Sequence, residues 1–191
     1  MYPFIKILIT GLCVAILAGC GVTKPSRFYI LTPSDDSGPP AMTTPGPAVG
    51  VGPVSFPAYL DRPEIVHRSG NNQLHYAGSE RWAEPLETTF TRTLAENLAI
   101  LLPSDRVALY PWSRSAQLEY QVTVNVVRFD ADANGTVVLM AGWEVIRAGD
   151  KTAVARNRTR YTEAAGKLDY PAIVAAQSRL VQRLSQDVAN S

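Results

Sequence analysis

The sequence predicts an α+β domain, a two-layer sandwich in which two long helices pack on one face of an antiparallel or mixed β-sheet. Two patterns indicate this fold class. Three consecutive segments within residues 118–162 alternate apolar and polar side chains, with the period of a half-buried strand. Residues 85–102, and the stretch that follows Asp169, instead place an apolar residue at every third or fourth position, as in a helix that faces a core.

The N-terminus resembles the signal peptide of a bacterial lipoprotein. Lys6 precedes an uncharged run over residues 7–18, which is shorter than the about 20 apolar residues of a membrane-spanning helix. The run ends in LAGC (residues 17–20), which resembles a lipobox, the motif whose cysteine is acylated and becomes the new N-terminus. We therefore expect cleavage of residues 1–19 and lipidation of Cys20. The alternative is an uncleaved signal anchor that buries this cysteine.

Residues 20–26 form a lipidated tether that reaches only about 20 Å. Residues 27–191 are then a single periplasmic domain held close to a membrane. Three acyl chains, palmitate among those that bacterial lipoproteins carry, make such attachment effectively permanent. Gly21 occupies the position where aspartate favours inner-membrane retention in enterobacteria, so we expect sorting to the outer membrane, with the domain facing the periplasm.

Before the first helix we expect strands at residues 27–32 and 48–56. The first of them carries large apolar side chains on both faces, which predicts cover on both sides. Between the two strands, residues 33–47 are rich in Pro, Gly and Ser and predict a loop. A hairpin follows, with arms at residues 65–68 and 73–76 around a Ser-Gly-Asn-Asn turn.

The first helix is expected over residues 85–102, because leucine or phenylalanine recurs there at every fourth position from Leu86. A short strand follows at residues 106–110. The second helix begins at residues 169–171, and Ile173 opens the apolar stripe that continues to Val188.

Three strands between the helices form an antiparallel meander. They are expected at residues 118–129, 137–146 and 152–162, with a turn at residues 130–135. The alternation breaks at Val126-Val127, which predicts a β-bulge.

Composition indicates one globular domain and argues against a nucleic-acid-binding protein. The 191 residues are 46% hydrophobic and 18% charged, and the formal net charge is +1. Lys6 accounts for the excess positive charge, so the mature chain is near neutral. Nucleic-acid binding relies on a marked basic surplus, which is missing here.

Residues that could support catalysis or metal binding are few. His67 and His75 lie on the two arms of the expected hairpin and could form half of a zinc site, but two surface histidines are the simpler interpretation. Asp130 and Asp132 begin a calcium-loop-like sequence without its final glutamate, so we expect a hairpin turn. We predict no enzyme activity, no cofactor and no metal.

Two groups of residues are candidate partner-binding surfaces. Arg156, Arg158 and Arg160 alternate along one strand and so project from one side, either as a solvated sheet edge or toward lipid headgroups or an acidic partner. The second group consists of large and charged side chains in connecting segments, which either cap the core or dock a partner. Its members are Tyr59, Leu60, Asp61, Arg62, Arg81 and Trp82.

Several stretches together resemble the PqiC family, the ABC-type transport auxiliary lipoproteins of Gram-negative bacteria. They are LAGC, FYIL (residues 28–31), PAYLDRPEIV (57–66), ERWAEPLETTFTRTLAENL (80–98) and AGWEV (141–145). The resemblance spans essentially the whole mature chain.

The resemblance implies a non-enzymatic outer-membrane lipoprotein that forms a homo-oligomer. Its implied partners are MCE-domain proteins, which form a lipid conduit across the periplasm. It would dock the conduit to the outer membrane. The first alternative is a periplasmic module that binds a lipid or another hydrophobic ligand, which requires a cavity where the apolar pattern predicts a filled core. The second is an envelope enzyme, which no recognised catalytic motif in the sequence supports.

Overall fold

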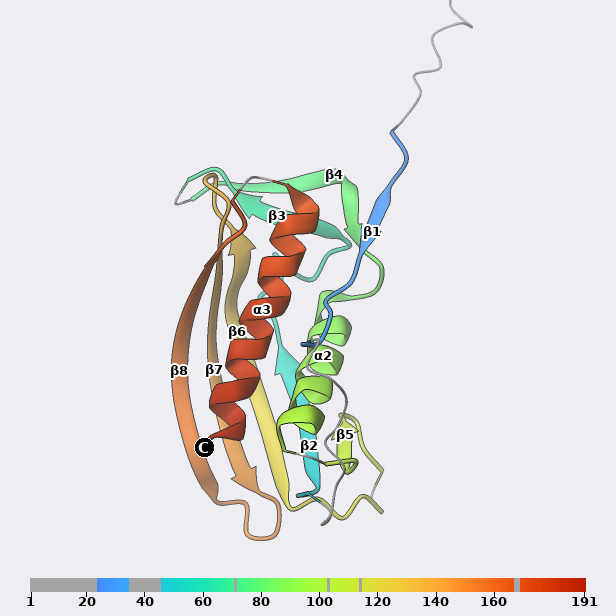
Figure 1. The fold of residues 1–191 in the computed structure, drawn as a ribbon, viewed down its shortest axis with the longest axis vertical. Helices are drawn as coiled ribbons and strands as arrows, with labels where there is room; N and C mark the ends of the chain where they lie inside the picture. The colour runs from blue at the N-terminus through green and yellow to red at the C-terminus, as the bar shows by residue number, and fades with distance from the viewer. Residues whose placement is uncertain (1–23, 35–45, 71, 103, 114, 167–168) are drawn as a thin grey trace, which may run out of the picture.

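The computed structural model describes residues 24–34, 46–70, 72–102, 104–113, 115–166 and 169–191. These residues form an eight-stranded mixed sheet and two helices (Figure 1). In chain order the elements are β1 (Arg27–Tyr29), β2 (Val49–Ser55), β3 (Glu64–Arg68), β4 (Leu74–Trp82), α2 (Leu86–Leu101), β5 (Val107–Leu109), β6 (Tyr120–Ala131), β7 (Thr136–Arg147), β8 (Ala153–Ala164) and α3 (Tyr170–Ala189).

Strand β6 organises the sheet. On one side it begins the predicted antiparallel meander, pairing with β7, which in turn pairs with β8. On its other side the first half of β6 pairs in parallel with β2, and β5 continues that part of the sheet. The far end of β6 meets β3 at the pair His67 and Ala131, and from there β4 and β1 extend the sheet.

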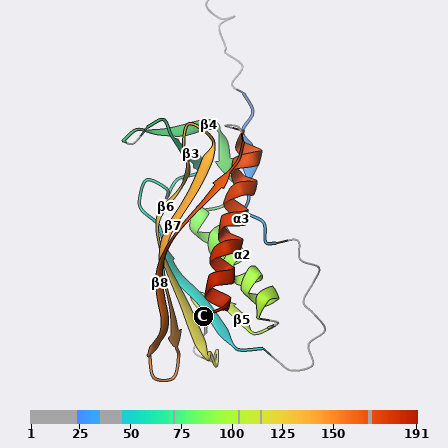
Figure 2. The same cartoon turned by 60° about the vertical axis from the view of Figure 1, so that its left-hand side comes forward.

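The two helices cover the concave side of this sheet. In Figures 1 and 2 the sheet curls as a half-barrel, with α2 and α3 side by side within the curve. Their apolar stripes face inward: Phe90 and Leu94 of α2 and Leu180 and Leu184 of α3 are fully buried. The α+β class, the mixed sheet and the two long helices are therefore confirmed, whereas the two-layer sandwich is not confirmed, because the sheet is curled.

The predicted bulge in β6 is confirmed, since the register with β7 shifts between Val126 and Arg128. The predicted cover of the first strand on both faces is wrong. Strand β1 lies at the end of the sheet beside β4, and Phe28 is 64% exposed. Apolar side chains on both faces do not distinguish a buried strand from an edge strand, because only the neighbouring elements decide burial.

Polar side chains of the helices hold the chain that leaves β1. The amide of Leu31 donates to the Thr89 hydroxyl at 3.2 Å, and the amide of Ser34 donates to the Asn97 side chain at 2.9 Å. Asn97 also donates to Ser185 at 3.2 Å, which joins the two helices. These buried polar residues satisfy backbone groups that would otherwise lack a partner.

Candidate functional site

The three arginines predicted to project together do so, on the outward face of β8. Tyr161 and Glu163, which follow Arg160 on the opposite face of the strand, contact Asp187 and Arg179 of α3, so the arginines point away from the helices. Arg156, Arg158 and Arg160 are all exposed.

Their surroundings differ. Arg156 forms a 2.6 Å ion pair with Glu144 of β7, and Arg160 lies beside the Met140 sulfur at 3.8 Å. Arg158 stands opposite Gly142 and forms no side-chain hydrogen bond within the described residues. The arginine row thus presents one partnered and one available guanidinium side by side.

A hollow opens on this outward face beside Arg158. A side chain at Gly142 would meet no atom within 4 Å, so the missing side chain leaves space above the sheet. The hollow has a volume of about 660 Å³ and extends over β2, β6, β7 and β8, with Ser55, Asn125 and Glu144 among its lining residues. Charged and polar side chains line it together with apolar surface, a mixture that is typical of protein–protein interfaces.

The second predicted surface is only partly a surface. The side chains of Leu60 and Trp82 belong to the core, with exposed fractions of 2% and 4%. The backbone amide of Trp82 donates to Pro63 at 2.7 Å, which fixes the end of β4. Leu60 and Trp82 therefore pack in the core, as in the core-capping alternative.

The remaining members of that group are accessible or partly accessible. The Arg62 guanidinium lies 4.1 Å from the centre of the Tyr76 ring and 3.5 Å from the Glu64 carboxylate. Arg81 approaches the same carboxylate at 3.4 Å, while Asp61 is exposed. This outer patch is held by contacts among its own residues, each of which contributes little at an exposed site.

Tyr59 belongs instead to a buried ionic cluster centred on Asp130, which has no exposed surface. Arg68 donates to Asp130 at 2.9 Å, Arg128 donates at 2.8 Å, and the Tyr59 hydroxyl donates at 3.0 Å. Burial, followed by the nearby Asp130 charge, raises the pKa of Tyr59 to about 12. The phenol therefore remains a hydrogen-bond donor at neutral pH, and the carboxylate is fully satisfied.

Sequence reasoning missed this Asp130 cluster. Arg128 and Asp130 are two residues apart and share one face of β6, which is a detectable signal. Arg68 and Tyr59 lie 62 and 71 residues before Asp130 in the chain, and only the fold brings them close.

The two histidines pair directly across the β3–β4 hairpin, with stacked rings whose centres are 5.3 Å apart. Burial and the neighbouring His75 lower the pKa of His67, whose Nδ1 lies 3.4 Å from the Tyr170 hydroxyl. In the part of the chain that the structure describes, no third histidine, cysteine or carboxylate joins them in a metal-binding group.

Asp132 acts as a turn residue. Its carboxylate accepts the backbone N–H groups of Asn134 and Thr136, both at 2.9 Å. With Asp130 bound by arginines, the start of the calcium-loop-like sequence forms the turn of the β6–β7 hairpin, as expected.

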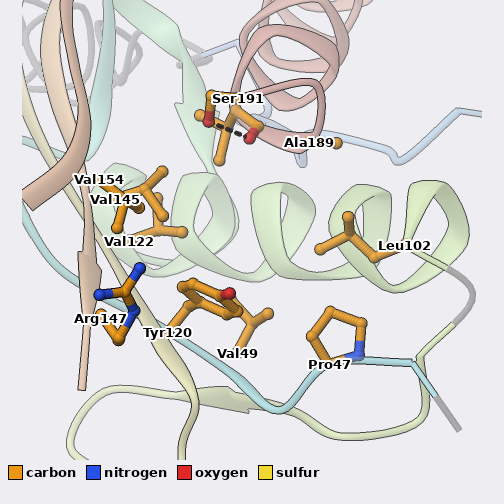
Figure 3. Close-up of a pocket in the computed structure, with 11 residues that line it drawn as sticks. Pro47, Val49, Leu102, Tyr120, Val122, Val145, Arg147, Val154, Ala189 and Ser191 are labelled. Atoms are coloured by element: carbon orange, nitrogen blue, oxygen red, sulfur yellow. Dashed lines mark hydrogen bonds between the residues drawn. The ribbon is translucent and has the colours of Figure 1, made fainter. Parts of the chain in front are cut away.

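An apolar cavity of about 270 Å³ lies between the sheet and the C-terminal ends of both helices (Figure 3). Val49, Val122 and Val145 line its sheet side, and Leu102 lines its helix side. Arg147 and Tyr120 are the polar members of the sheet side, as Figure 3 shows. The pocket is half-open to solvent, and the exposed residues Arg147 and Ser191 are part of its rim.

Cys20 and the predicted signal peptide lie outside the described residues. Among the described residues, none of the helices is long and apolar enough to cross a membrane.

Comparisons with known proteins agree with this fold. A solved structure described as an uncharacterized protein has a TM-score of 0.71 and 20% sequence identity, covering 87% of this chain and 98% of that chain. A protein from Xanthomonas campestris has a TM-score of 0.65 and 17% identity, covering 85% of this chain and 92% of its own. At these identities the similarity concerns the fold alone. No curated protein matches the chain significantly.

The sequence model of the family described as "ABC-type transport auxiliary lipoprotein component" matches residues 29–189, which include every described helix and nearly every described strand. The chain therefore belongs to the ABC-type transport auxiliary lipoprotein family, the PqiC-like family that its motifs resemble.

Proposed function

We propose that the chain is a non-catalytic docking component of an MCE-type intermembrane lipid transport system, anchored through Cys20 in the outer membrane and facing the periplasm. Family membership supports a role beside a transporter. The observation that carries the docking role is the exposed Arg158 beside the outward hollow, on a face that the helices leave uncovered.

The chemistry of this face favours an acidic protein partner. Arg156 is already paired with Glu144, whereas Arg158 has no such partner within the described residues and is exposed. A carboxylate of the partner would form a charge-assisted, bidentate hydrogen bond with Arg158, the kind of contact that guides association and sets specificity. The hollow beside it accommodates the partner's neighbouring side chains.

The arginines on β8 also help to keep its unpaired edge from aggregating with other chains. It pairs only with β7 among the described strands, so one long edge has unpaired backbone groups. Arginines along an edge strand discourage nonspecific pairing with other chains. A homo-oligomer, as the family resemblance implies, would bring several such faces to one partner and multiply a weak contact.

Photocrosslinking from the full chain in cells tests the docking role. A photoreactive residue at position 158 is expected to capture an MCE-domain protein, while one at the exposed Arg106, near β5, serves as the matched control. Arg158→Glu should lower capture from a neighbouring probe at Asn157. Capture from neither position, or equal capture from both, would contradict docking through this face.

The apolar cavity favours a second candidate function, the binding of a hydrophobic ligand. Its lining suits an aliphatic chain, since each buried methylene contributes about 0.8 kcal/mol. Ala189→Trp would fill the cavity from the C-terminal end of α3. If native mass spectrometry finds a copurifying lipid in the wild type and none in this variant, the second function gains support, whereas an empty wild type excludes it.

A further inference from the structure

A second pocket on the outward face gathers three arginines. It has a volume of about 480 Å³ and lies where the β3–β4 hairpin, the β6–β7 turn and β8 come together. Arg68 comes from β3, Arg128 from β6 and Arg160 from β8. The arginine row of β8 is thus divided, because Arg158 lines the hollow and Arg160 lines this pocket.

The Asp130 cluster holds two of these arginines in place. Arg68 and Arg128 both donate their Nε–H groups to the buried Asp130 carboxylate, and both side chains are about one-fifth exposed. Within the described residues, the terminal nitrogens of Arg128 form no hydrogen bond. An arginine that is already oriented loses less conformational entropy when it binds a ligand.

The charge of the pocket is positive despite two carboxylates. Asp130 lies beneath the surface and offsets one of the two arginines that contact it. Asp132 lines the pocket, but its carboxylate already accepts two backbone N–H groups of the turn. Among the described residues that line the pocket or contact its arginines, three guanidinium groups and two carboxylates leave one net positive charge for an anion. Guanidinium groups form planar, bidentate hydrogen bonds that match the oxygens of a phosphate.

The pocket lies at the end of the fold from which the N-terminal segment leaves. Figures 1 and 2 show the β3–β4 hairpin and the β6–β7 turn at the same end of the molecule as the start of β1, opposite the C-terminus. The chain from residue 20 to residue 27 spans at most about 25 Å. A lipid anchor at Cys20 therefore keeps this end near the headgroups of the membrane.

We propose that the pocket formed by Arg68, Arg128 and Arg160, named here the phosphate pocket, binds the phosphate group of a phospholipid in the anchoring membrane. This inference rests on the proposed anchor at Cys20 for the position of the pocket. Binding of one headgroup would orient the domain on the membrane, so that the hollow beside Arg158 faces along the periplasmic side toward a partner.

The test measures phospholipid binding to the full chain in dodecyl maltoside, a detergent without phosphate or charge. Native mass spectrometry is used to titrate dioleoylphosphatidylglycerol, with dioleoylglycerol as the probe that has the same chains and no phosphate. Arg160→Gln should weaken phosphatidylglycerol binding about fivefold, the effect of removing one arginine near an anionic surface. Arg106→Gln is the control at an exposed arginine outside the pocket, and it should bind as the wild type does.

Each other outcome overturns the proposal. Equal binding by Arg160→Gln and the wild type would exclude the phosphate pocket, and equal binding of both lipids would show that the acyl chains alone are recognised. Inorganic phosphate is a separate arm: if it binds the wild type while phosphatidylglycerol does not, the site takes a free anion and not a membrane lipid. Because the lipid is added from solution, the result does not depend on lipidation of Cys20 or on capture of an MCE-domain protein.

Discussion

Replacing Asp130 with alanine should strongly destabilise the fold. The carboxylate has no exposed surface and balances two guanidinium groups. Removing one partner from a fully buried ion pair costs about 3–5 kcal/mol. Arg68 and Arg128 keep side-chain exposures of 20% and 21%, so part of their hydration survives, and we expect a loss of about 2–4 kcal/mol in the free energy of unfolding.

Thermal unfolding of the full chain in dodecyl maltoside, followed by circular dichroism, measures this loss. For a chain of this size about 1 kcal/mol lowers Tm by about 2–4 °C, so Asp130→Ala should lower Tm by about 5–15 °C. Asp61→Ala is the control, because Asp61 is exposed and its carboxylate forms no hydrogen bond within the described residues. That variant should stay within about 0.5 kcal/mol of the wild type.

A rescue variant separates the charge effect from lost packing. Arg68→Met and Arg128→Met combined with Asp130→Leu replace the ionic cluster by apolar side chains, which should recover much of the stability. If Asp130→Ala unfolds within about 1 °C of the wild type, or if the combined variant is less stable than Asp130→Ala, the buried carboxylate does not stabilise the fold as described.

Three further predictions follow from other parts of the fold. Trp82→Ala should lower the free energy of unfolding by about 3–5 kcal/mol in urea denaturation, because the side chain is buried. A loss below about 1 kcal/mol would contradict the burial of Trp82 in the core. The pKa of His67 is lowered in the folded chain, so as the pH falls below about 6.5 the unfolded chain takes up this proton more readily and the folded state loses stability. The decrease in Tm between about pH 7.5 and pH 5.5 should therefore be smaller in His67→Gln than in the wild type. An equal decrease in both would contradict this. Hydrogen bonds from the Tyr29 hydroxyl and, to a smaller extent, from Arg27 lower the pKa of Glu80. The Glu80 carboxylate therefore stabilises the folded chain at pH values above its unfolded pKa, and this stabilisation is lost as the pH falls through the folded pKa. Glu80→Gln should therefore speed hydrogen exchange in β1 and leave β6 unchanged, and unchanged exchange in β1 would show that Glu80 does not hold this strand.

The meander shows what local pattern can predict. Its middle strand is expected at residues 137–146 and forms at Thr136–Arg147, and the bulge in β6 occurs where the alternation breaks. A strand with one buried face requires alternating side chains, so its own residues carry the signal. The same holds for α2, whose stripe of apolar residues recurs at every fourth position.

Pairing between distant strands has no such signal. The parallel contacts of β2 with β5 and β6 join segments that are about sixty to seventy residues apart. Whether a strand such as β1 is covered depends on the elements beside it, and Phe28 is exposed because β1 ends the sheet.

The candidate sites divide in the same way. The alternation of arginines on β8 placed Arg156, Arg158 and Arg160 on one face, as predicted. The sequence pattern did not reveal that Arg160 lies with Arg68 and Arg128, because a charged residue in a sequence does not show which residues will be its neighbours in the fold.

The sequence by itself determined the order and period of the strands and helices, the family, and the expectation of a lipid anchor at Cys20, since each of these depends on residues that are close in the chain or on motifs read directly. The tertiary structure alone decided the curl of the sheet, the burial of Leu60 and Trp82, and the assembly of the Asp130 cluster and the phosphate pocket. The physical reason is that burial and ion pairing are properties of neighbours in space, and the curled sheet brings these neighbours together from separate parts of the chain.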